Sequence, residues 1–568
     1  MGPQSEDGEC YCLKTKDDGF GAKFEASFSR LNQCQRKVII AFLRDMQCDH
    51  MAYITRVSGP PGTGKTITIS TLLCILLERN CRTVMCAATK VAITVVLRHV
   101  LALLKESREQ GVNERLSLAS IVLVDNEKPF GAAFECENVS LDFRVKQLAE
   151  CFHPESGWRA CFSSLLDFLK KCRSQYKDLV KKGARSMSYG DQDAVPSPLQ
   201  YGPFVSFVRD KFMATAPRVK RYVSVFCTHL PQSFLLKQNI YRMQLLTTQL
   251  DSFESVLLQD NLKFEQLHKL PSQAKSIKSL LRLLRDSLGE LPFPDVTKAD
   301  SIIEFCLRLP TLVVCEAHCS FRLYTAEMQP VNVLVIDEGS QLTECESVVA
   351  LQLPGLKHAI LFGDENQLPA TLKSKLSSTS GYGRSMFQRL GLLNWPKHVL
   401  HIQYRMHPAI SSFPNSKFYL NQIMDAPNVR SWGWEKQYLP GKLFGPYSFI
   451  NISQSKEEVD DEGQLRNLVE VAVLMKILQN LYREWRCSSQ KLSVSVMSPY
   501  PAQVIEIERR LAQRYQNSGD FAVQVKTIEG FQGSEADVVI ILTVRSNVAG
   551  SMQSISDFRR VNVALTRA

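Results

Sequence analysis

The sequence GPPGTGKT at residues 59–66 constrains the fold more than any other stretch of this chain. It follows a short apolar stretch and precedes the apolar run at residues 67–77, the order of strand, loop and helix that a phosphate-binding loop requires. Gly62 and Gly64 allow backbone N–H groups to turn inward around phosphate oxygens. The helix that begins near Lys65 adds the positive end of its dipole. These features predict a site for a nucleoside triphosphate.

The side chains of this loop have distinct expected roles. Lys65 is expected to bridge the β- and γ-phosphates, and the Thr66 hydroxyl is expected to hold Mg²⁺. The residues expected to contact the nucleotide here are Gly59, Gly62, Thr63, Gly64, Lys65 and Thr66. The pattern specifies so many positions that a chance glycine-rich turn explains it poorly.

A carboxylate pair follows a second apolar run. Residues 333–336 are all apolar, which is typical of a strand buried in a parallel sheet, so Asp337 and Glu338 are predicted to emerge at its carboxyl end. Ligands bind at that edge of such sheets. Asp337 suits the Mg²⁺ shell, and Glu338 suits the general base that orients or deprotonates an attacking water. An isolated Asp-Glu pair is usually a solvated turn, but the preceding strand and the phosphate loop favour a catalytic pair here.

The composition fits a multidomain intracellular protein. The chain has 568 residues, 45% of them hydrophobic, which allows three or four domains with ample core. Its 17 cysteines are scattered, and the isolated pair Cys10 and Cys12 is too close to build a zinc site, so reduced thiols are expected. The sequence shows no secretory signal, no myristoylation pattern and no apolar run approaching the ~20 residues that span a bilayer. We therefore expect no membrane association.

The net charge of +11 suits a polyanionic partner without identifying one. The sharpest basic cluster has spacings of three and four and consists of Lys170, Arg173, Lys177, Lys181 and Arg185. These spacings place the cluster on one face of a helix. Two interpretations remain open: a solvated helix face, or a stripe that follows a phosphate backbone.

Further strands are predicted in the carboxyl half of the chain. Apolar runs at residues 493–498, 523–527 and 537–544 are each expected to form a strand. Together with the strands of the amino-terminal half, they alternate with helical patterns in two separate regions. This alternation predicts two lobes, each built on a parallel sheet.

Several motifs occur in a characteristic order along the chain. GPPGTGKT is followed by GDENQLPA at residues 363–370, QYRMHP at 403–408, GFQGSE at 530–535 and RRVNVALTRA at 559–568. In this order they resemble a superfamily 1 helicase of the nonsense-mediated-decay and senataxin-like branch, which includes many uncharacterised plant helicases. LNQCQ, at the start of the matching region, resembles the adenine-reading Q motif of that branch.

The resemblance implies roles for residues outside the phosphate loop. Gln35 would read adenine, Tyr404 would stack near the base and Glu535 would approach the ribose. Gln367 would sense the γ-phosphate, and Arg405 and Arg567 would act as arginine fingers from the second lobe. Planar, permanently charged arginine is well suited to neutralise the charge that spreads over the γ-oxygens in the transition state.

Contacts to nucleic acid are implied at four positions, namely Thr89, Lys90, Tyr500 and Thr527. Lys90 replaces the asparagine of the family's strand-gripping motif, a change that favours phosphate. Glu316 stands where relatives carry threonine, and a carboxylate facing phosphate would repel it. Alternatively, Glu316 points sideways to a neighbouring Lys or Arg. A core tyrosine is as good an interpretation of Tyr500 as a strand contact.

The predicted fold class is α/β, with two RecA-like parallel-sheet lobes and a large, mainly helical insertion in the first. The expected division is a short segment at 1–30, the first lobe at 31–109 and 301–384, the insertion at 110–300, and the second lobe, truncated at its carboxyl end, at 385–568. Leucine-rich stripes at helical spacing within the insertion are expected to form its core, and residues 183–203 are expected to form an exposed loop.

The function expected from the motifs and the resemblance is an ATP-dependent helicase or translocase on single-stranded nucleic acid, with RNA favoured over DNA. It would use ATP and Mg²⁺, act as a monomer and move 5′ to 3′, in RNA processing or surveillance. The nucleus is the favoured location and the cytoplasm the alternative. A second hypothesis, motivated by Glu316 and the short carboxyl end, is a nucleic-acid-binding scaffold with weak or no motor activity. The choice between RNA and DNA, the pathway and the protein partners stay open.

Overall fold

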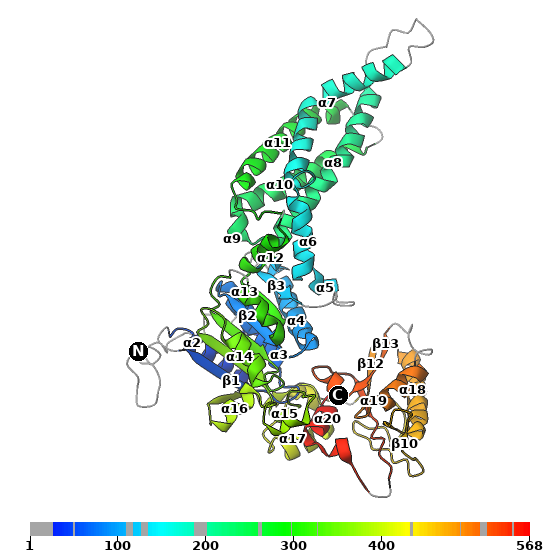
Figure 1. The fold of residues 1–568 in the computed structure, drawn as a ribbon. Helices are drawn as coiled ribbons and strands as arrows, with labels where there is room; N and C mark the ends of the chain where they lie inside the picture. The colour runs from blue at the N-terminus through cyan, green and yellow to red at the C-terminus, as the bar shows by residue number, and fades with distance from the viewer. Residues whose placement is uncertain are drawn as a thin grey trace.

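The computed structural model describes residues 27–48, 52–109, 117–125, 134–186, 201–259, 264–296, 298–325, 328–431, 436–488, 490–511, 520–547 and 550–568. Figure 1 shows a first lobe built on a large sheet, a long helical arm that extends away from it, and a second, smaller lobe beside it. In these residues, no helix combines the length and the apolar character needed to cross a bilayer.

The first lobe is built on a seven-stranded parallel sheet with the order β3-β4-β2-β5-β6-β1-β7. Its strands are β1 (Tyr53–Ser58), β2 (Thr83–Ala87), β3 (Ile121–Val124), β4 (Leu312–Glu316), β5 (Val333–Asp337), β6 (His358–Gly363) and β7 (Lys397–Val399). Strands β2, β3, β5 and β6 are buried along their whole length because helices cover both faces of the sheet, which accounts for their near-continuous apolar sequences.

Alternate residues of a strand point to opposite faces, so the sheet separates two cores. Val333 and Val335 of β5 belong to one core, which includes residues of α2 (Gln33–Asp45), α3 (Lys65–Glu78) and α4 (Lys90–Glu109). Leu334 and Ile336 belong to the other. The shorter helices of the first lobe and the arm base are α5 (Phe134–Glu137), α12 (Ala299–Arg308), α13 (Arg322–Thr325), α14 (Glu344–Leu351), α15 (Lys375–Thr379) and α16 (Met386–Leu392).

The first lobe extends beyond the ranges predicted from the sequence. Strand β3, which falls in the predicted insertion, pairs with β4 in the large sheet. Strand β7, which falls in the predicted second lobe, pairs with β1. Phe387 of α16 and Leu400 are also buried in the cores of the first lobe, as is Phe28, which precedes the predicted start of the lobe. The boundary between the lobes therefore lies close to Leu400, and the insertion begins after β3.

The arm consists mainly of long helices that run side by side (Figure 1). These helices are α6 (Leu141–Phe152), α7 (Trp158–Ser186), α8 (Tyr201–His229), α10 (Lys237–Leu257) and α11 (Phe264–Gly289), with the short α9 (Gln232–Leu235) between α8 and α10. The leucine-rich stripes predicted to form the core are Leu246, Leu250, Phe253, Leu257, Ile277, Leu281, Leu284 and Leu288, and all of them are buried. They belong to the same core cluster as Leu334 and Ile336 of the sheet, so the arm core is continuous with one face of the first lobe.

The two ends of the predicted loop at residues 183–203 differ from the prediction. Helix α7 continues to Ser186 and α8 begins at Tyr201, so both ends of the predicted loop are helical. The intervening residues 187–200 lie outside the described part of the chain.

A buried arginine joins the base of the arm to the first lobe. Arg144 of α6 is almost fully buried, and its guanidinium donates to the carbonyl oxygens of Ala119 (3.1 Å), Leu118 (3.1 Å) and Ile121 (2.5 Å). Burial lowers the pKa of Arg144 to about 10. The three carbonyls lie at the start of β3, so one side chain ties this edge strand to the arm.

The second lobe contains a three-stranded parallel sheet with the order β13-β12-β14. Its main elements are α18 (Leu468–Ser488), β12 (Leu492–Ser498), α19 (Pro501–Leu511), β13 (Phe521–Thr527), β14 (Val538–Ile541) and α20 (Phe558–Leu565). All three predicted strands are present, but β14 ends at Ile541 rather than at residue 544. The segment between the lobes and the start of the second lobe hold β8 (Ile402–Gln403), α17 (Pro408–Phe418), β9 (Met424–Asp425), β10 (Glu458–Val459) and β11 (Leu465–Arg466).

Candidate nucleotide and nucleic-acid site

A cleft of about 1730 Å³ lies between the two lobes. It is lined by the phosphate loop, by the carboxylate pair Asp337 and Glu338, and by Gln367, Arg405 and Arg567. The lobes also meet through an apolar cluster, which joins Leu368 of the first lobe to Met497, Ile528, Phe531, Val563 and Ala564 of the second. The structure therefore brings the residues predicted for ATP chemistry to one place.

The phosphate loop has the backbone that its glycines predict. Gly62 and Gly64 have φ angles of 73° and 82°, a region that side chains other than glycine disfavour. Gly64 precedes α3 directly, and a Cβ there would approach Gln35 Nε2 to 2.4 Å. The Lys65 ammonium folds back and donates to the Gly59 carbonyl oxygen at 2.6 Å, while Thr63 Oγ1 donates to Pro60 O at 2.7 Å.

Two segments from elsewhere in the chain contact this loop. The buried Gln35 donates from Nε2 to Thr63 O at 3.0 Å, and its own backbone N–H is capped by Asn32 Oδ1 at 2.9 Å. Asn32 Nδ2 donates in turn to the Tyr404 hydroxyl at 2.9 Å. The backbone N–H of Tyr404 donates to Gly62 O at 2.9 Å. The three predicted nucleotide contacts Gln35, Thr63 and Tyr404 are thus part of one hydrogen-bonded network.

The carboxylate pair lies at the carboxyl end of β5, as predicted. Asp337 and Glu338 are both buried, and Asp337 Oδ1 accepts the Glu338 backbone N–H at 2.8 Å. Glu338 has a φ of 50°, and its Oε2 accepts from Gln341 Nε2 at 3.0 Å. Burial raises the pKa of Asp337 to about 7, with Glu338 adding to the rise and Lys65 opposing it. Thr66 and Asp337 offer the hydroxyl and carboxylate oxygens that Mg²⁺ prefers, so they fit this ion.

Gln367 and Arg567 are in direct contact across the lobe boundary. The Arg567 side chain is 3% exposed, and its Nη2 donates to Gln367 Oε1 at 3.2 Å while its Nε donates to Val563 O at 2.9 Å. Burial lowers the pKa of Arg567 to about 10, and the charge of Arg405 adds to this effect. Glu338 acts in the opposite direction, which indicates that the predicted base and finger share one electrostatic environment.

Arg405 forms a salt bridge with Glu535, the residue predicted to approach the ribose. The remaining contacts of Arg405 connect it to the phosphate loop and to α20. Its Nε and Nη2 donate to Glu535 Oε2 at 2.8 and 2.7 Å, and its Nη1 donates to Thr566 O at 3.2 Å. A Cβ at Gly62 would approach Arg405 Cβ to 2.8 Å, so Arg405 also lies directly against the phosphate loop. Arg405 therefore lies between the phosphate loop on one side and Glu535 and the Thr566 carbonyl on the other.

Three residues of the site were missed by sequence reasoning. Asp364 is buried, which raises its pKa, and its Oδ2 accepts from Gln367 Nε2 at 2.8 Å and from the Tyr419 hydroxyl at 2.7 Å. Asn562 Nδ2 donates to the same hydroxyl at 2.7 Å, and to Asn366 O at 2.7 Å. Asp364 and Asn562 lie inside motifs that had been recognised, GDENQLPA and RRVNVALTRA, whereas no sequence pattern marks Tyr419.

The predicted nucleic-acid contacts form one group on each lobe. Lys90 begins α4, at the carboxyl end of β2, and its Nζ is 2.9 Å from Asp125 Oδ1. The preceding residue, Thr89, accepts the Ala92 backbone N–H at 3.3 Å. On the second lobe, Thr527 ends β13 and accepts the Gly530 N–H at 3.3 Å, and Tyr500 follows β12 and is buried. The burial of Tyr500 agrees with the alternative of a core side chain.

Comparison with known proteins gives matches along most of the chain. Two family models, both described as AAA domain, match residues 30–375 and 382–568. The probable helicase MAGATAMA 3 of Arabidopsis thaliana is 37% identical over 245 residues, which are 42% of this chain and 29% of that protein. The helicase SEN1 of Saccharomyces cerevisiae is 34% identical over 248 residues, 42% of this chain and 11% of that protein.

A homolog of regulator of nonsense transcripts 1 from Arabidopsis thaliana is 30% identical over 312 residues, 53% of this chain and 24% of that protein. Among solved structures, the DUF1998 helicase MrfA bound to DNA aligns over 60% of this chain and 51% of that one. The TM-score is 0.14 and the sequence identity is 9%, so this likeness carries no argument. The matched regions span less than a third of the length of each of the three relatives.

Proposed function

Because the chain belongs to the AAA-domain helicases of superfamily 1, in the branch of Sen1 and regulator of nonsense transcripts 1, we propose that it hydrolyses ATP to move along single-stranded nucleic acid. The observation that carries this proposal is that the phosphate loop, the carboxylate pair, Arg405 and Arg567 all line one cleft.

The residues of the cleft that the sequence motifs single out each have a proposed part in hydrolysis. Lys65 and the loop backbone would bind the phosphates, and Thr66 and Asp337 would hold Mg²⁺, which would neutralise phosphate charge. Glu338 orients the attacking water and accepts its proton. Gln367 is suited to sense the γ-phosphate, because it lies between Asp364 and Arg567 through hydrogen bonds to both.

The proposed link between hydrolysis and movement is the position of the arginines. Arg567 directly follows Thr566, at the end of α20, and Arg405 contacts the Thr566 carbonyl oxygen. A change in the lobe interface would therefore move the Arg567 guanidinium group relative to the phosphate loop and to Arg405. Neutralisation of the negative charge in the transition state would then depend on cleft closure. Each ATP cycle would therefore open and close the two lobes around a nucleic-acid strand that both lobes contact.

The finer identity of the substrate is also proposed. RNA is favoured over DNA because one relative is named for nonsense transcripts. The family resemblance also suggests movement from 5′ to 3′ and a monomeric state. It further suggests a role in RNA processing or surveillance in the nucleus. The nucleic acid would cross the carboxyl edges of the two sheets, where Lys90 and Thr527 lie. A second candidate function, a scaffold with little motor activity, is favoured by Glu316 at the end of β4.

Strand-stimulated ATP hydrolysis distinguishes the two functions. The purified chain is assayed with Mg²⁺ and ATP, alone and with single-stranded RNA or DNA of matched length, and a Glu338→Gln variant measures the background. A motor predicts stimulation by nucleic acid, greater for RNA, that the variant lacks. Tight strand binding with hydrolysis at the background rate would support the scaffold instead.

A further inference from the structure

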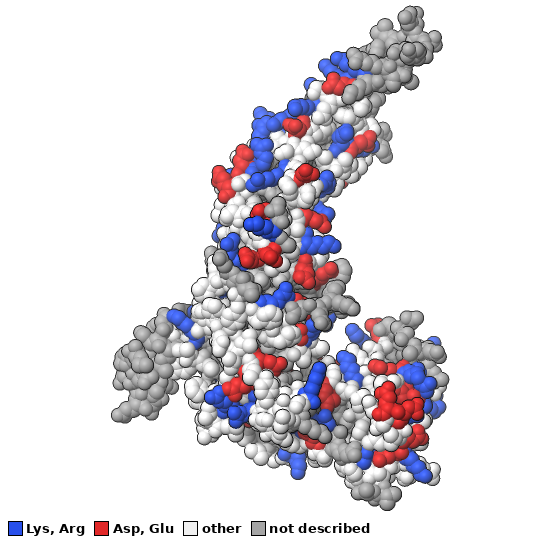
Figure 2. Space-filling view, in the orientation of Figure 1, with Lys and Arg blue, Asp and Glu red and all other residues white. Residues whose placement is uncertain are grey.

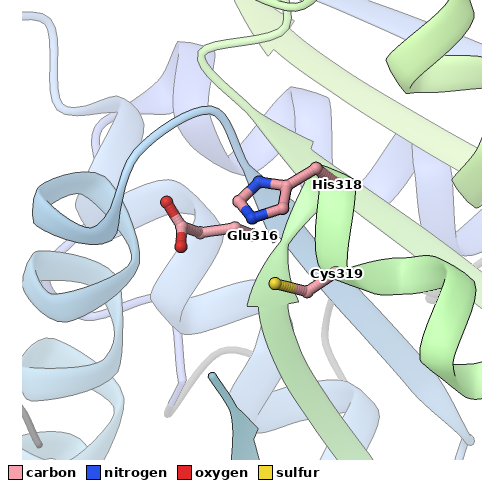
Figure 3. A group of neighbouring side chains, drawn as sticks. All are labelled: Glu316, His318 and Cys319. Carbon is pink, nitrogen blue, oxygen red and sulfur yellow. The ribbon is translucent and has the colours of Figure 1, made fainter. Parts of the chain in front are cut away.

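Three metal-binding side chains lie together at the carboxyl end of β4. A Glu316 carboxylate oxygen, a ring nitrogen of His318 and the Cys319 sulfur all lie within 4.8 Å of one another. Figure 3 shows the His318 ring beside the Glu316 carboxylate, with the Cys319 sulfur pointing to the same side of the turn. Glu316 is half-buried, His318 is exposed and Cys319 is buried, so the group is partly accessible to solvent.

The backbone fixes this arrangement. Glu316 is the last residue of β4 and the N-cap of the 3₁₀ turn η3 (Ala317–Phe321), which carries the other two side chains. The Ser320 hydroxyl donates to Ala317 O at 2.7 Å within the turn. Ala317 and Cys319 are anchored in the same core cluster as the sheet. Little ordering is therefore required of the chain when a ligand binds, because the side chains stand on one rigid turn.

The donor set selects for a particular kind of ion. Thiolate, imidazole and carboxylate are the ligands of Zn²⁺, whereas Mg²⁺ and Ca²⁺ take oxygen ligands. Three protein ligands leave the fourth tetrahedral position of Zn²⁺ open to water or to another donor. We propose that Glu316, His318 and Cys319 bind one Zn²⁺ ion.

The surroundings of the group favour a dication. The carboxylates of Glu316 and Asp125 both lie near the Cys319 sulfur. The Glu316 carboxylate attracts a positive ion, whereas Asp125 already pairs with Lys90 at 2.9 Å. Zn²⁺ adds two positive charges and the thiol releases one proton on binding, so the three ligands and the ion change from one net negative charge to neutral.

A consequence for nucleic acid rests on the proposed function. Glu316 pairs in register with Ala87, the last residue of β2, so it lies beside the segment that leads to Thr89 and Lys90. The negative charge of Glu316 at this edge opposes a phosphate backbone, and Zn²⁺ would offset that charge while offering its open position to a phosphate oxygen. The ion would thus convert an unfavourable residue of the strand path into a favourable one.

Metal content tests the site directly. The full chain is dialysed with Zn²⁺ and excess Mg²⁺, so that the phosphate-loop site is occupied by Mg²⁺, and bound zinc is measured. We expect His318→Ala and Cys319→Ser each to lose one equivalent of zinc relative to the parent, and Cys487→Ser to lose none, since Cys487 is an exposed cysteine outside the group. His318 is exposed, so its replacement should leave the fold intact even if Cys319→Ser does not. Equal zinc content in the parent and His318→Ala would overturn the proposal.

Cobalt provides a spectroscopic check on the ligands. Co²⁺ bound to the parent should give a thiolate-to-cobalt charge-transfer band and the visible bands of a tetrahedral ion, which Zn²⁺ then displaces. The charge-transfer band should be absent in Cys319→Ser and retained in Cys487→Ser. A parent spectrum without a thiolate band would also overturn the site.

Strand binding separates this inference from the proposed function. At low salt, Zn²⁺ should tighten the binding of single-stranded RNA by the parent by about two- to tenfold and should leave His318→Ala unchanged. Zinc binding without strand-stimulated ATP hydrolysis would refute the motor and leave the metal site standing. Stimulated hydrolysis without zinc binding would refute only the metal site.

Discussion

At the residue scale, the chemistry of the cleft depends on buried charges that oppose one another. Asp337 and Asp364 are both buried, and Lys65 lowers the pKa of each against the effect of burial. Glu338 adjoins Asp337 and influences Arg567 from the other side of the cleft. A substitution at any of these positions therefore changes the electrostatic environment of the others, so conservative replacements are the informative ones.

The first prediction concerns the proposed base. Glu338→Gln keeps the shape of the side chain and its acceptor for Gln341 but removes the proton acceptor, so hydrolysis should fall at least ~100-fold with ATP binding nearly unchanged. Steady-state hydrolysis and equilibrium binding of a fluorescent ATP analogue measure the two effects. Parental turnover in this variant would show that Glu338 is not the base.

The second prediction concerns the phosphate ligand. Lys65→Ala removes a charged donor from the loop, so ATP affinity itself should fall by roughly tenfold or more, in contrast to the Glu338 variant. Calorimetric titration measures the affinity, and Lys105→Ala, on the same lobe but in α4, serves as a matched control. If ATP binds Lys65→Ala as tightly as the parent, Lys65 does not hold the phosphates.

The residues of the site were predictable to different degrees. Those inside contiguous motifs, such as Lys65 and Asp337, could be assigned because their spacing and the adjacent apolar run indicate both the local structure and the chemistry. Tyr419 could not, because its role comes from a contact with Asp364, 55 positions away in the sequence. The salt bridge between Lys90 and Asp125 was missed for the same reason, since it depends on the neighbouring strand order β2-β4-β3.

At the scale of elements, helix α20 supplies the connection between the lobes. Asn562 donates to the Tyr419 hydroxyl and to Asn366 O, and Val563 and Ala564 belong to the apolar interface with Leu368. The helix ends two residues before Arg567. Its docking therefore determines where this guanidinium group lies.

The third prediction tests the arginine fingers. Arg405→Ala and Arg567→Ala should each preserve ATP binding and lower turnover by roughly 10³-fold, because the guanidinium groups are needed in the transition state. Arg559→Ala, at a half-buried arginine in the first turn of α20, is the matched control and should keep parental turnover. Equal losses of binding and turnover would assign the two arginines a structural role, and for the buried Arg567 thermal unfolding of the variant shows whether the lobe interface remains intact.

The fourth prediction concerns the base of the arm. Arg144→Met removes the donors to three buried carbonyl oxygens at the start of β3, so the free energy of unfolding should fall by about 3 kcal/mol or more. Denaturant titration measures the change, with the exposed Arg173→Met of α7 as control. A stability within about 0.5 kcal/mol of the parent would show that these hydrogen bonds contribute little.

The elements themselves were predicted well where the apolar runs are long. The strand at 333–336 and the stripes of α10 and α11 were identifiable from hydrophobic periodicity alone. Strands β3 and β7 were not assigned to the first sheet, because runs of four and three residues carry too little periodicity to reveal their pairing. Their membership depends on long-range contacts with β4 and β1.

At the scale of the whole molecule, charge is distributed along the arm as well as around the cleft. Figure 2 shows Lys and Arg side chains gathered along one side of the arm, with acidic side chains among them. Lys170, Arg173, Lys177 and Lys181 of α7 are exposed, as expected for a helix face, whereas the side chain of Arg185 lies outside the described part of the chain. Both interpretations of this cluster require exposure, so burial does not separate them.

The fifth prediction separates them by strand length. If the cluster follows a phosphate backbone, replacing Lys170, Arg173 and Lys177 by Glu should weaken the binding of a long single strand and flatten its salt dependence. A short strand that fills only the cleft should bind the variant and the parent alike. Fluorescence anisotropy at two salt concentrations measures both, and equal affinities for the long strand would identify a solvated helix face.

The shared core of the arm and the first lobe has a mechanical consequence. Since the two form one packed body, the arm is expected to follow every rotation of that lobe rather than bend at its base. Helix α7 alone, with 29 residues, spans about 44 Å at 1.5 Å per residue. A rotation of about 10° at the cleft would displace the far end of such a helix by roughly 8 Å. A small rotation of the first lobe would thus become a wide sweep at the far end of the arm.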